Sequence, residues 1–222
     1  MMKSHTSSWA LLLGGALLAP VVLADSYTFG PAAGQSVTIY QGTTSIGTSA
    51  GIFKMSAGTS YNASTAFDVF CVDINGPINW GETVNFSLGS IETAPVGAGE
   101  TAMGANRAKL INALIDLYYA PAKLNATTAA NLQLAIWDVV VASSSSSLFL
   151  DVTKSANPAL TSGTIYNMLT AAGAVSNPNN HIALLSNSKQ DFAIVPVPDG
   201  GMTLALLGLG VGGLSFMARR RE

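Results

Sequence analysis

The chain has 222 residues and a net charge of −2, with 49% hydrophobic and only 10% charged residues. Residues 25–197 contain six basic and ten acidic residues, a net charge of −4, and the basic residues form no stripe. This pattern excludes the basic surface typical of nucleic-acid-binding domains, so we expect no nucleic-acid partner. About 170 residues remain between the two ends of the chain, enough for one domain with a substantial core.

Residues 1–24 have the pattern of a secretory signal peptide. Lys3 gives a weakly basic start, an apolar run follows over residues 9–21, and Val22-Leu23-Ala24 is a small-residue cleavage site. We expect cleavage between Ala24 and Asp25, and export of the chain across the inner membrane. A retained N-terminal anchor is the alternative, although its apolar run would be short and interrupted by glycine and proline.

The first part of the exported domain is predicted to be β-structure. Four segments are rich in Val, Ile, Phe and Tyr and are separated by turn-forming residues: 36–40, 51–56, 66–74 and 83–88. Asn75-Gly76-Pro77 and Asn79-Trp80-Gly81 have turn or loop chemistry. We therefore expect four strands within residues 27–92.

Helices are predicted in the middle of the domain. Residues 106–119 have helical apolar spacing, and this helix is expected to stop before Pro121. A second helix should begin near residues 125–128, which include the N-cap types Asn and Thr, and run to about residue 141. A third is expected over residues 164–172.

Residues 181–186 and 191–195 are predicted to form a final β-hairpin. The fold class is therefore α+β: a β-rich N-terminal half, two to three inserted helices, the hairpin, and a C-terminal transmembrane helix. We expect residues 25–195 to form a single extracytoplasmic domain.

The C-terminal residues 196–222 have three parts in order. The motif Val197-Pro198-Asp199-Gly200-Gly201 is followed by an uncharged apolar run from Met202 to Ala218 and then by Arg219, Arg220 and Arg221. At roughly 1.5 Å per residue the apolar run spans about 26 Å, just enough for a short membrane helix. The arginines form a stop-transfer signal that favours the cytoplasmic face, so the preceding domain should lie on the opposite side.

This ending resembles the PEP-CTERM sorting signals of Gram-negative bacteria, in particular the variant named for a Val-Pro-Asp-Ser-Gly core. Gly200 stands where that core has serine. The resemblance implies an exosortase-type membrane protease as a processing partner, and a cell-envelope, cell-surface or extracellular-matrix location after transient membrane anchoring. A plain C-terminal membrane anchor without processing is the alternative.

Cys71 is the only cysteine, so an exported chain cannot use it for an internal disulfide. It lies in the predicted strand sequence Phe70-Cys71-Val72-Asp73. Gln133 follows 62 residues later on the second predicted helix, with Trp137 one helical turn beyond it. Each half alone is compatible with ordinary core residues, since a buried cysteine behaves as a small hydrophobe.

Together the two halves resemble the internal thioester site of bacterial thioester domains, which combine an aromatic-Cys-apolar-acid motif with a Gln followed four residues later by Trp. The resemblance implies a Cys71–Gln133 cross-link formed with loss of ammonia. Its surroundings would be Phe70, Asp73 and Trp137, with Trp137 shielding the bond from water. Leu132 stands where the family commonly has Thr or Gln.

Two functions remain open from the sequence. One is a surface or matrix adhesin whose thioester captures an amine on a partner covalently, reacting once rather than acting as an enzyme. The other is a non-reactive structural or binding protein of the envelope with the same fold. The sequence offers no acid–base constellation for a hydrolase and no ligand set for a metal or cofactor. His181, the only histidine of the exported region, has no acid or cysteine near it in sequence.

Overall fold

The computed structural model of the protein describes residues 25–41, 44–74, 76, 78–95, 102–141, 148–149 and 162–195. Ala24 with the rest of the predicted signal peptide, and residues 196–222 with the sorting motif, apolar run and arginines, lie outside the described residues. Those assignments therefore stay predictions. Among the described residues, no helix combines the length and apolar character needed to cross a bilayer.

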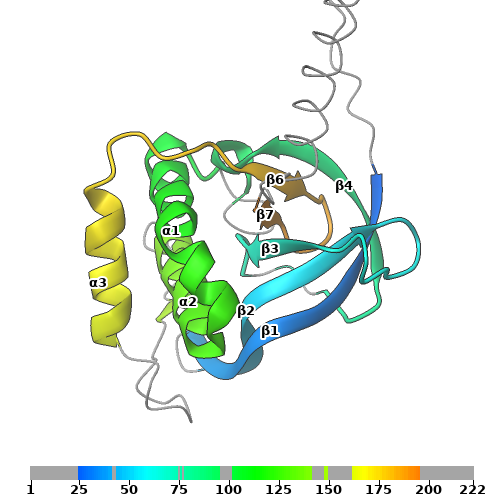
Figure 1. The fold of residues 1–222 in the computed structure, drawn as a ribbon, viewed down its shortest axis with the longest axis horizontal. Coiled ribbons are helices and arrows are strands. Elements are labelled where there is room, and N and C mark those ends of the chain that lie inside the picture. Colours follow the sequence, from blue (N-terminus) through cyan, green and yellow to red (C-terminus); the bar gives the residue numbers. More distant parts are fainter. Residues whose placement is uncertain are drawn as a thin grey trace, which may run out of the picture.

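Six antiparallel strands of the described chain close into a barrel (Figure 1). Around the barrel the order is β2-β3-β7-β6-β4-β1, and β1 closes it by pairing with β2. A two-residue strand, β5 (Leu148–Phe149), pairs with the end of β1. The barrel strands are β1 (Asp25–Gln41), β2 (Thr44–Ala57), β3 (Phe67–Cys71), β4 (Thr83–Ser90), β6 (Ile182–Leu185) and β7 (Phe192–Ile194).

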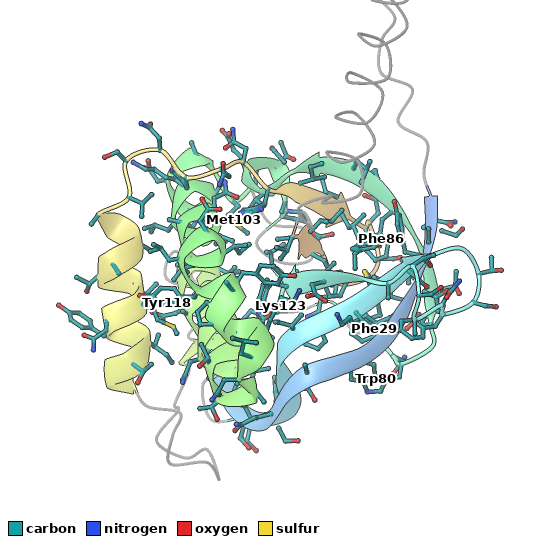
Figure 2. The ribbon with its side chains drawn as sticks, viewed as in Figure 1. Phe29, Trp80, Phe86, Met103, Tyr118 and Lys123 are labelled. Atoms are coloured by element: carbon teal, nitrogen blue, oxygen red, sulfur yellow. The ribbon has the colours of Figure 1, made fainter. Side chains whose placement is uncertain are left out.

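Aromatic side chains fill much of the barrel. Phe29 lies 5.4 Å from Phe53 and 5.6 Å from Phe192 between ring centroids, and Phe86 lies 6.0 Å from Phe192. Phe29 also stacks on Trp80 at 4.7 Å, and Figure 2 shows these two rings together near the start of β1. Such clusters bury large apolar areas and favour one arrangement of the strands around them.

Within the part of the chain that the structure describes, three α-helices lie on one side of the barrel: α1 (Ala105–Leu124), α2 (Ala126–Val141) and α3 (Ser162–Gly173). The 3₁₀ turn η1 (Ile91–Thr93) precedes α1. In Figure 1, α1 and α2 stand between the barrel and α3. Asn125 separates α1 from α2, and its side-chain oxygen caps α2 by accepting hydrogen bonds from the backbone N–H groups of Thr127 and Thr128.

The predicted order of elements is confirmed: strands first, then helices, then a final antiparallel hairpin formed by β6 and β7. The closure of the strands into a barrel was not predicted. β1 and β2 are far longer than the predicted segments, and glycines contribute to their close pairing. A Cβ atom at Gly34 would lie only 2.1 Å from the carbonyl oxygen of Ala50, so this close approach requires glycine.

Two further predicted boundaries are wrong. The helix expected to stop before Pro121 continues through it to Leu124. Proline removes one backbone hydrogen bond to the residue four positions earlier. That residue, Leu117, is 43% exposed, so solvent can reach the region of its unpaired carbonyl. The strand predicted over residues 66–74 ends at Cys71, which leaves Asp73 in the segment after the strand.

Candidate functional site

Cys71 is the last residue of β3, a strand with a neighbour on each side in the closed sheet. β3 pairs with β2 and with β7, where Phe192 stands opposite Cys71. The side chain of Cys71 is fully buried and its thiol is free. The strand therefore holds the thiol in a rigid and dry position.

The peptide groups of Cys71 have no strand partner on the β2 side. The ladder between β2 and β3 ends at the pair Phe53–Val69. On the other side, the N–H of Val72 donates to the carbonyl of Asp191 at 2.9 Å. Because backbone groups alternate in direction along a strand, the N–H and C=O of Cys71 face away from β7. Buried backbone groups need partners, so this position requires one from elsewhere in the fold.

Gln133 of α2 supplies that partner. Its Oε1 accepts a hydrogen bond from the N–H of Cys71 at 2.9 Å, and its Nε2 donates to the carbonyl of Cys71 at 2.8 Å. The carboxamide thus continues the ladder as the peptide group of another strand would. Gln133 is 0% exposed, and a buried amide without such bonds would be costly. The two predicted residues are therefore in direct contact.

The thiol of Cys71 donates a hydrogen bond to the carbonyl oxygen of Asp73 at 2.6 Å. Burial strongly raises the pKa of this thiol, and the nearby carboxylates of Asp73 and Asp191 raise the pKa further. The indole of Trp137 and the backbone of Asp73 act in the opposite direction through hydrogen bonding. Because burial dominates, the resting thiol is neutral, and its ionisation requires help from the surrounding groups.

Trp137 lies on α2 one turn after Gln133 and is 2% exposed. Its indole nitrogen makes no hydrogen bond of ordinary geometry in the described structure, although the indole is near enough to Cys71 to lower the pKa of its thiol. Trp137 therefore lies beside the sulfur, and its part in keeping water from the bond stays a prediction. The buried N–H is also available to a negative charge that develops there.

Phe70 and Tyr119 form the neighbouring contact between β3 and α1. Their rings meet edge to face at 6.4 Å. The hydroxyl of Tyr119 donates to Oδ2 of the buried Asp68 at 2.7 Å, and Asp68 also pairs with Lys54. Burial and the Asp68 carboxylate raise the pKa of Tyr119, so it remains a hydrogen-bond donor. This contact fixes α1 against the strand that ends in Cys71.

Asp191 is a member of the site that the sequence did not reveal. Its side chain is 0% exposed; Oδ1 accepts a hydrogen bond from the N–H of Ser186 at 2.6 Å, and Oδ2 has no partner. Burial, with a further contribution from the charge of Asp73, raises the pKa of Asp191 to about 7. In sequence it is an isolated acid at the start of the last strand, and only the β3–β7 pairing places it beside the Cys71 segment.

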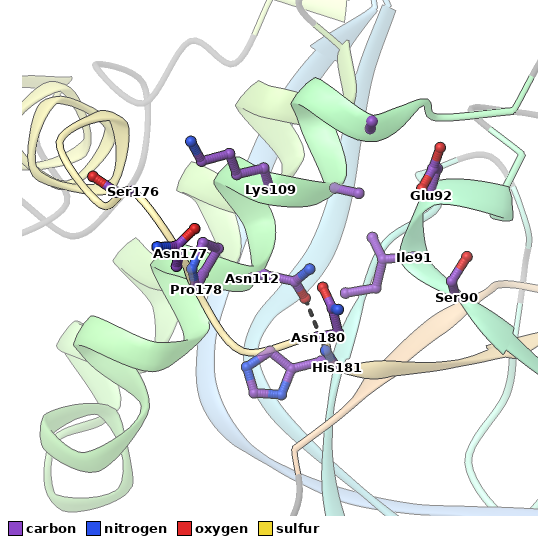
Figure 3. Close-up of a pocket in the computed structure, with 12 residues that line it drawn as sticks. Ser90, Ile91, Glu92, Lys109, Asn112, Ser176, Asn177, Pro178, Asn180 and His181 are labelled. Carbon is purple, nitrogen blue, oxygen red and sulfur yellow. Dashed lines mark hydrogen bonds between the residues drawn. The ribbon is translucent and has the colours of Figure 1, made fainter.

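A cavity of about 460 Å³ lies elsewhere, between α1 and the segment before β6 (Figure 3). His181 lines it with Asn112, whose side-chain oxygen accepts a hydrogen bond from the backbone N–H of His181 at 3.1 Å. Nε2 of His181 lies 3.0 Å from Oδ1 of Asp116, an acid that sequence proximity did not indicate. No residue of the Cys71–Gln133 pair lines this cavity.

No protein-family model matches the chain, and no curated protein matches its sequence. Two solved structures are similar to it. The N-terminal thioester domain of the fibronectin-binding protein SfbI from Streptococcus pyogenes is 14% identical, with a TM-score of 0.41 over 81% of this chain and 97% of that one. The N-terminal thioester domain of a surface protein from Clostridium perfringens is 11% identical, with a TM-score of 0.40 over 77% of this chain and 99% of that one. At such low identities and TM-scores, the likeness assigns no function to this chain.

Proposed function

We propose that the protein is an exported bacterial surface or extracellular-matrix protein whose Cys71 and Gln133 form an internal thioester, which captures an amine on a partner covalently. The observation that supports this is the pair of reciprocal hydrogen bonds between the Gln133 carboxamide and the peptide groups of Cys71. The protein would react once and would not turn over as an enzyme.

The chemistry requires Sγ of Cys71 to attack the side-chain carbonyl carbon of Gln133. The Sγ–C bond forms, the bond from that carbon to Nε2 breaks, and the thiol proton leaves with the amide nitrogen as ammonia. The N–H of Cys71 already donates to Oε1, so it can stabilise negative charge on that oxygen during attack. Holding both groups on a strand and a packed helix replaces an improbable encounter by a fixed one.

Capture of a partner reverses the roles. An amine attacks the same carbon, the new N–C bond forms, the Sγ–C bond breaks, and a proton from the amine ends on the sulfur. A thioester is far more reactive than the amide it replaces, so the fold must protect it from water. The complete burial of Cys71 and Gln133 and the 2% exposure of Trp137 are consistent with that need.

A non-reactive envelope protein with the same fold is the second candidate. The observation that favours it is that the resting thiol is neutral and bonded to the carbonyl of Asp73, while both polar ends of the Gln133 amide are satisfied. These contacts would also stabilise an inert core.

Intact mass of the purified residue 25–195 domain distinguishes the two candidates. We expect the wild-type mass to be lower by one ammonia than the sequence requires, and incubation with methylamine to add one methylamine. The Cys71→Ala variant should show the full sequence mass and no uptake. A wild-type domain with full mass and one titratable thiol after unfolding would contradict the thioester.

Sorting through an exosortase-type protease is proposed from residues 196–222 alone. Cells producing the full chain should export it beyond the inner membrane and shorten it at the C-terminus, whereas a chain ending at residue 196 should be exported without envelope attachment. Fractionation followed by mass analysis of the recovered protein measures both. A full-length chain that stays uncut in the inner membrane would instead identify residues 202–218 as a plain anchor.

A further inference from the structure

We propose that Asp191 is an electrostatic gate on the Cys71–Gln133 site: its carboxylate slows opening of the thioester by an amine, and its neutral form permits it. The inference depends on the proposed thioester and adds a regulatory residue to it. The charge of Asp191 acts on the sulfur of Cys71 through space. Asp191 therefore has a supporting role and forms no bond to the reacting atoms.

The geometry places a second buried acid beside the cysteine segment. The carbonyl of Asp191 is bonded to the N–H of Val72, and Phe192, its neighbour, stands opposite Cys71. Asp73, two residues after Cys71, is 5% exposed, and Asp191 is 0% exposed. When both are ionised, two carboxylates in a dry environment repel each other and repel negative charge on the nearby sulfur.

The turn between β6 and β7 holds Asp191 in this position. Its Oδ1 accepts from the N–H of Ser186, which closes the turn, while Gln190 donates its side-chain amide to the carbonyl of Asp73 at 2.7 Å. The same Asp73 carbonyl accepts the thiol hydrogen bond of Cys71. The turn that holds Asp191 and the thiol of Cys71 therefore meet at one carbonyl group, that of Asp73.

The remaining oxygen, Oδ2 of Asp191, is buried and has no hydrogen-bond partner. An ionised carboxylate normally collects donors, so an unpartnered buried oxygen favours the protonated form. This agrees with the raised pKa of Asp191, about 7. The group therefore changes charge near neutral pH.

The other ionisable groups near this turn do not neutralise Asp191. Asp73 and Cys71 face it from β3 and the segment that follows, and the charge of Asp73 raises the pKa of Asp191. Lys189 lies in the same turn, but its ammonium is 2.6 Å from the carboxylate of Glu82. No described cation is paired with Asp191.

The effect on the reaction follows from the bond that breaks. When an amine opens the thioester, negative charge develops on Sγ of Cys71 as the Sγ–C bond lengthens. A carboxylate at Asp191 opposes that charge, whereas a neutral carboxyl does not. At the separations typical of a buried cluster, we expect an effect of about tenfold on the rate.

The test uses the wild-type domain, Asp191→Asn and the matched control Asp116→Asn. Asparagine keeps an oxygen for the N–H of Ser186 and removes the charge. Asp116 binds Asn179 and His181, outside the site. The measurement is the rate of methylamine uptake by intact mass, corrected for the fraction of free amine, at pH values below and above about 7.

We expect the corrected rate of wild type and Asp116→Asn to fall about tenfold as the pH rises through the pKa of Asp191. Asp191→Asn should stay at the fast level throughout. A wild-type rate without this inflection would overturn the gate even if the variant failed to fold, and so would an Asp191→Asn profile that follows wild type.

If the wild-type domain proves to retain its ammonia, the thioester has failed and the gate is tested on the free thiol. The same three proteins are then alkylated with iodoacetamide over the same pH range. At pH values above the pKa of Asp191, the Asp191→Asn variant should react about tenfold faster than wild type and Asp116→Asn. The reason is that the thiolate of Cys71 is less strongly disfavoured when no carboxylate stands at position 191. Equal rates would overturn the gate as well.

Discussion

Gln133→Glu should reduce the free energy of unfolding at neutral pH by about 3–5 kcal/mol, the cost typical of an unpaired buried charge. One oxygen of the new carboxylate can still accept from the N–H of Cys71. The other replaces Nε2 and would face the carbonyl of Cys71, so a bond becomes a repulsive contact. The variant should also lose all capacity for cross-linking, because a carboxylate is not displaced by a thiol.

The pH dependence of this variant identifies the cause. Burial should raise the pKa of the introduced glutamic acid in the folded state above its unfolded value of about 4.3. Its protonated form can donate to the carbonyl of Cys71 as the amide does. The stability deficit should therefore be small below the unfolded pKa and grow as the pH rises toward the folded pKa.

Urea unfolding of Gln133→Glu at several pH values measures the effect. The matched control is Gln35→Glu, since Gln35 is half-buried and binds the hydroxyl of Thr127. That substitution should cost less than about 1 kcal/mol and change little with pH. Equal losses in the two variants would mean that the Cys71–Gln133 contact is not the tight, dry pairing described above.

Asp191→Asn should alter the pH dependence of stability more than any other single acid substitution in the barrel. The pKa of Asp191 is raised from 3.8 to about 7, so the folded state holds a proton that the unfolded state releases. Wild-type stability should therefore be complete below about pH 4 and fall, by up to about 4 kcal/mol, as the pH rises through the folded pKa. The asparagine variant should lack this decline.

The three proteins are compared by how steeply the free energy of unfolding changes with pH, not by its absolute value. Asparagine places an N–H₂ where Oδ2 has no partner, which adds a cost of about 1–3 kcal/mol that does not change with pH. Denaturant unfolding of wild type, Asp191→Asn and Asp116→Asn at pH values between the two pKa limits separates the slope from this constant. Parallel curves for all three proteins would show that Asp191 is ionised in the folded domain like an ordinary surface acid.

The element types could be read from local pattern because short-range physics decides them. Helical apolar spacing and the capping chemistry of Asn125 predicted α2 within a residue or two of its limits, Ala126 and Val141. Element boundaries that depend on solvent exposure were harder to predict from the sequence. The continuation of α1 past Pro121 depends on the solvent exposure of its last turn. Local sequence pattern does not indicate that exposure.

Some residues of the candidate site could likewise be predicted from the sequence, and others could not. Cys71 and Gln133 stood out because the strand motif around the lone cysteine and the Gln-to-Trp spacing on the helix together resemble the site of bacterial thioester domains. Asp73 was expected on the strand, but β3 ends at Cys71 and the backbone carbonyl of Asp73 binds the thiol. Asp191 had no sequence signal, since a single acid before a short strand is common.

What the amino-acid order by itself determines here is the kind of each element, the predicted export and sorting pattern at the two ends, and the two side chains of the proposed thioester. The closure of six strands, the insertion of Gln133 where the β2–β3 ladder stops, and the burial of Asp191 beside Cys71 became visible only in three dimensions. The reason is physical: pattern along a chain reflects contacts with near neighbours and with solvent. Pairing between β3, β7 and α2 joins residues 62 or more positions apart, and its geometry depends on the whole packed core.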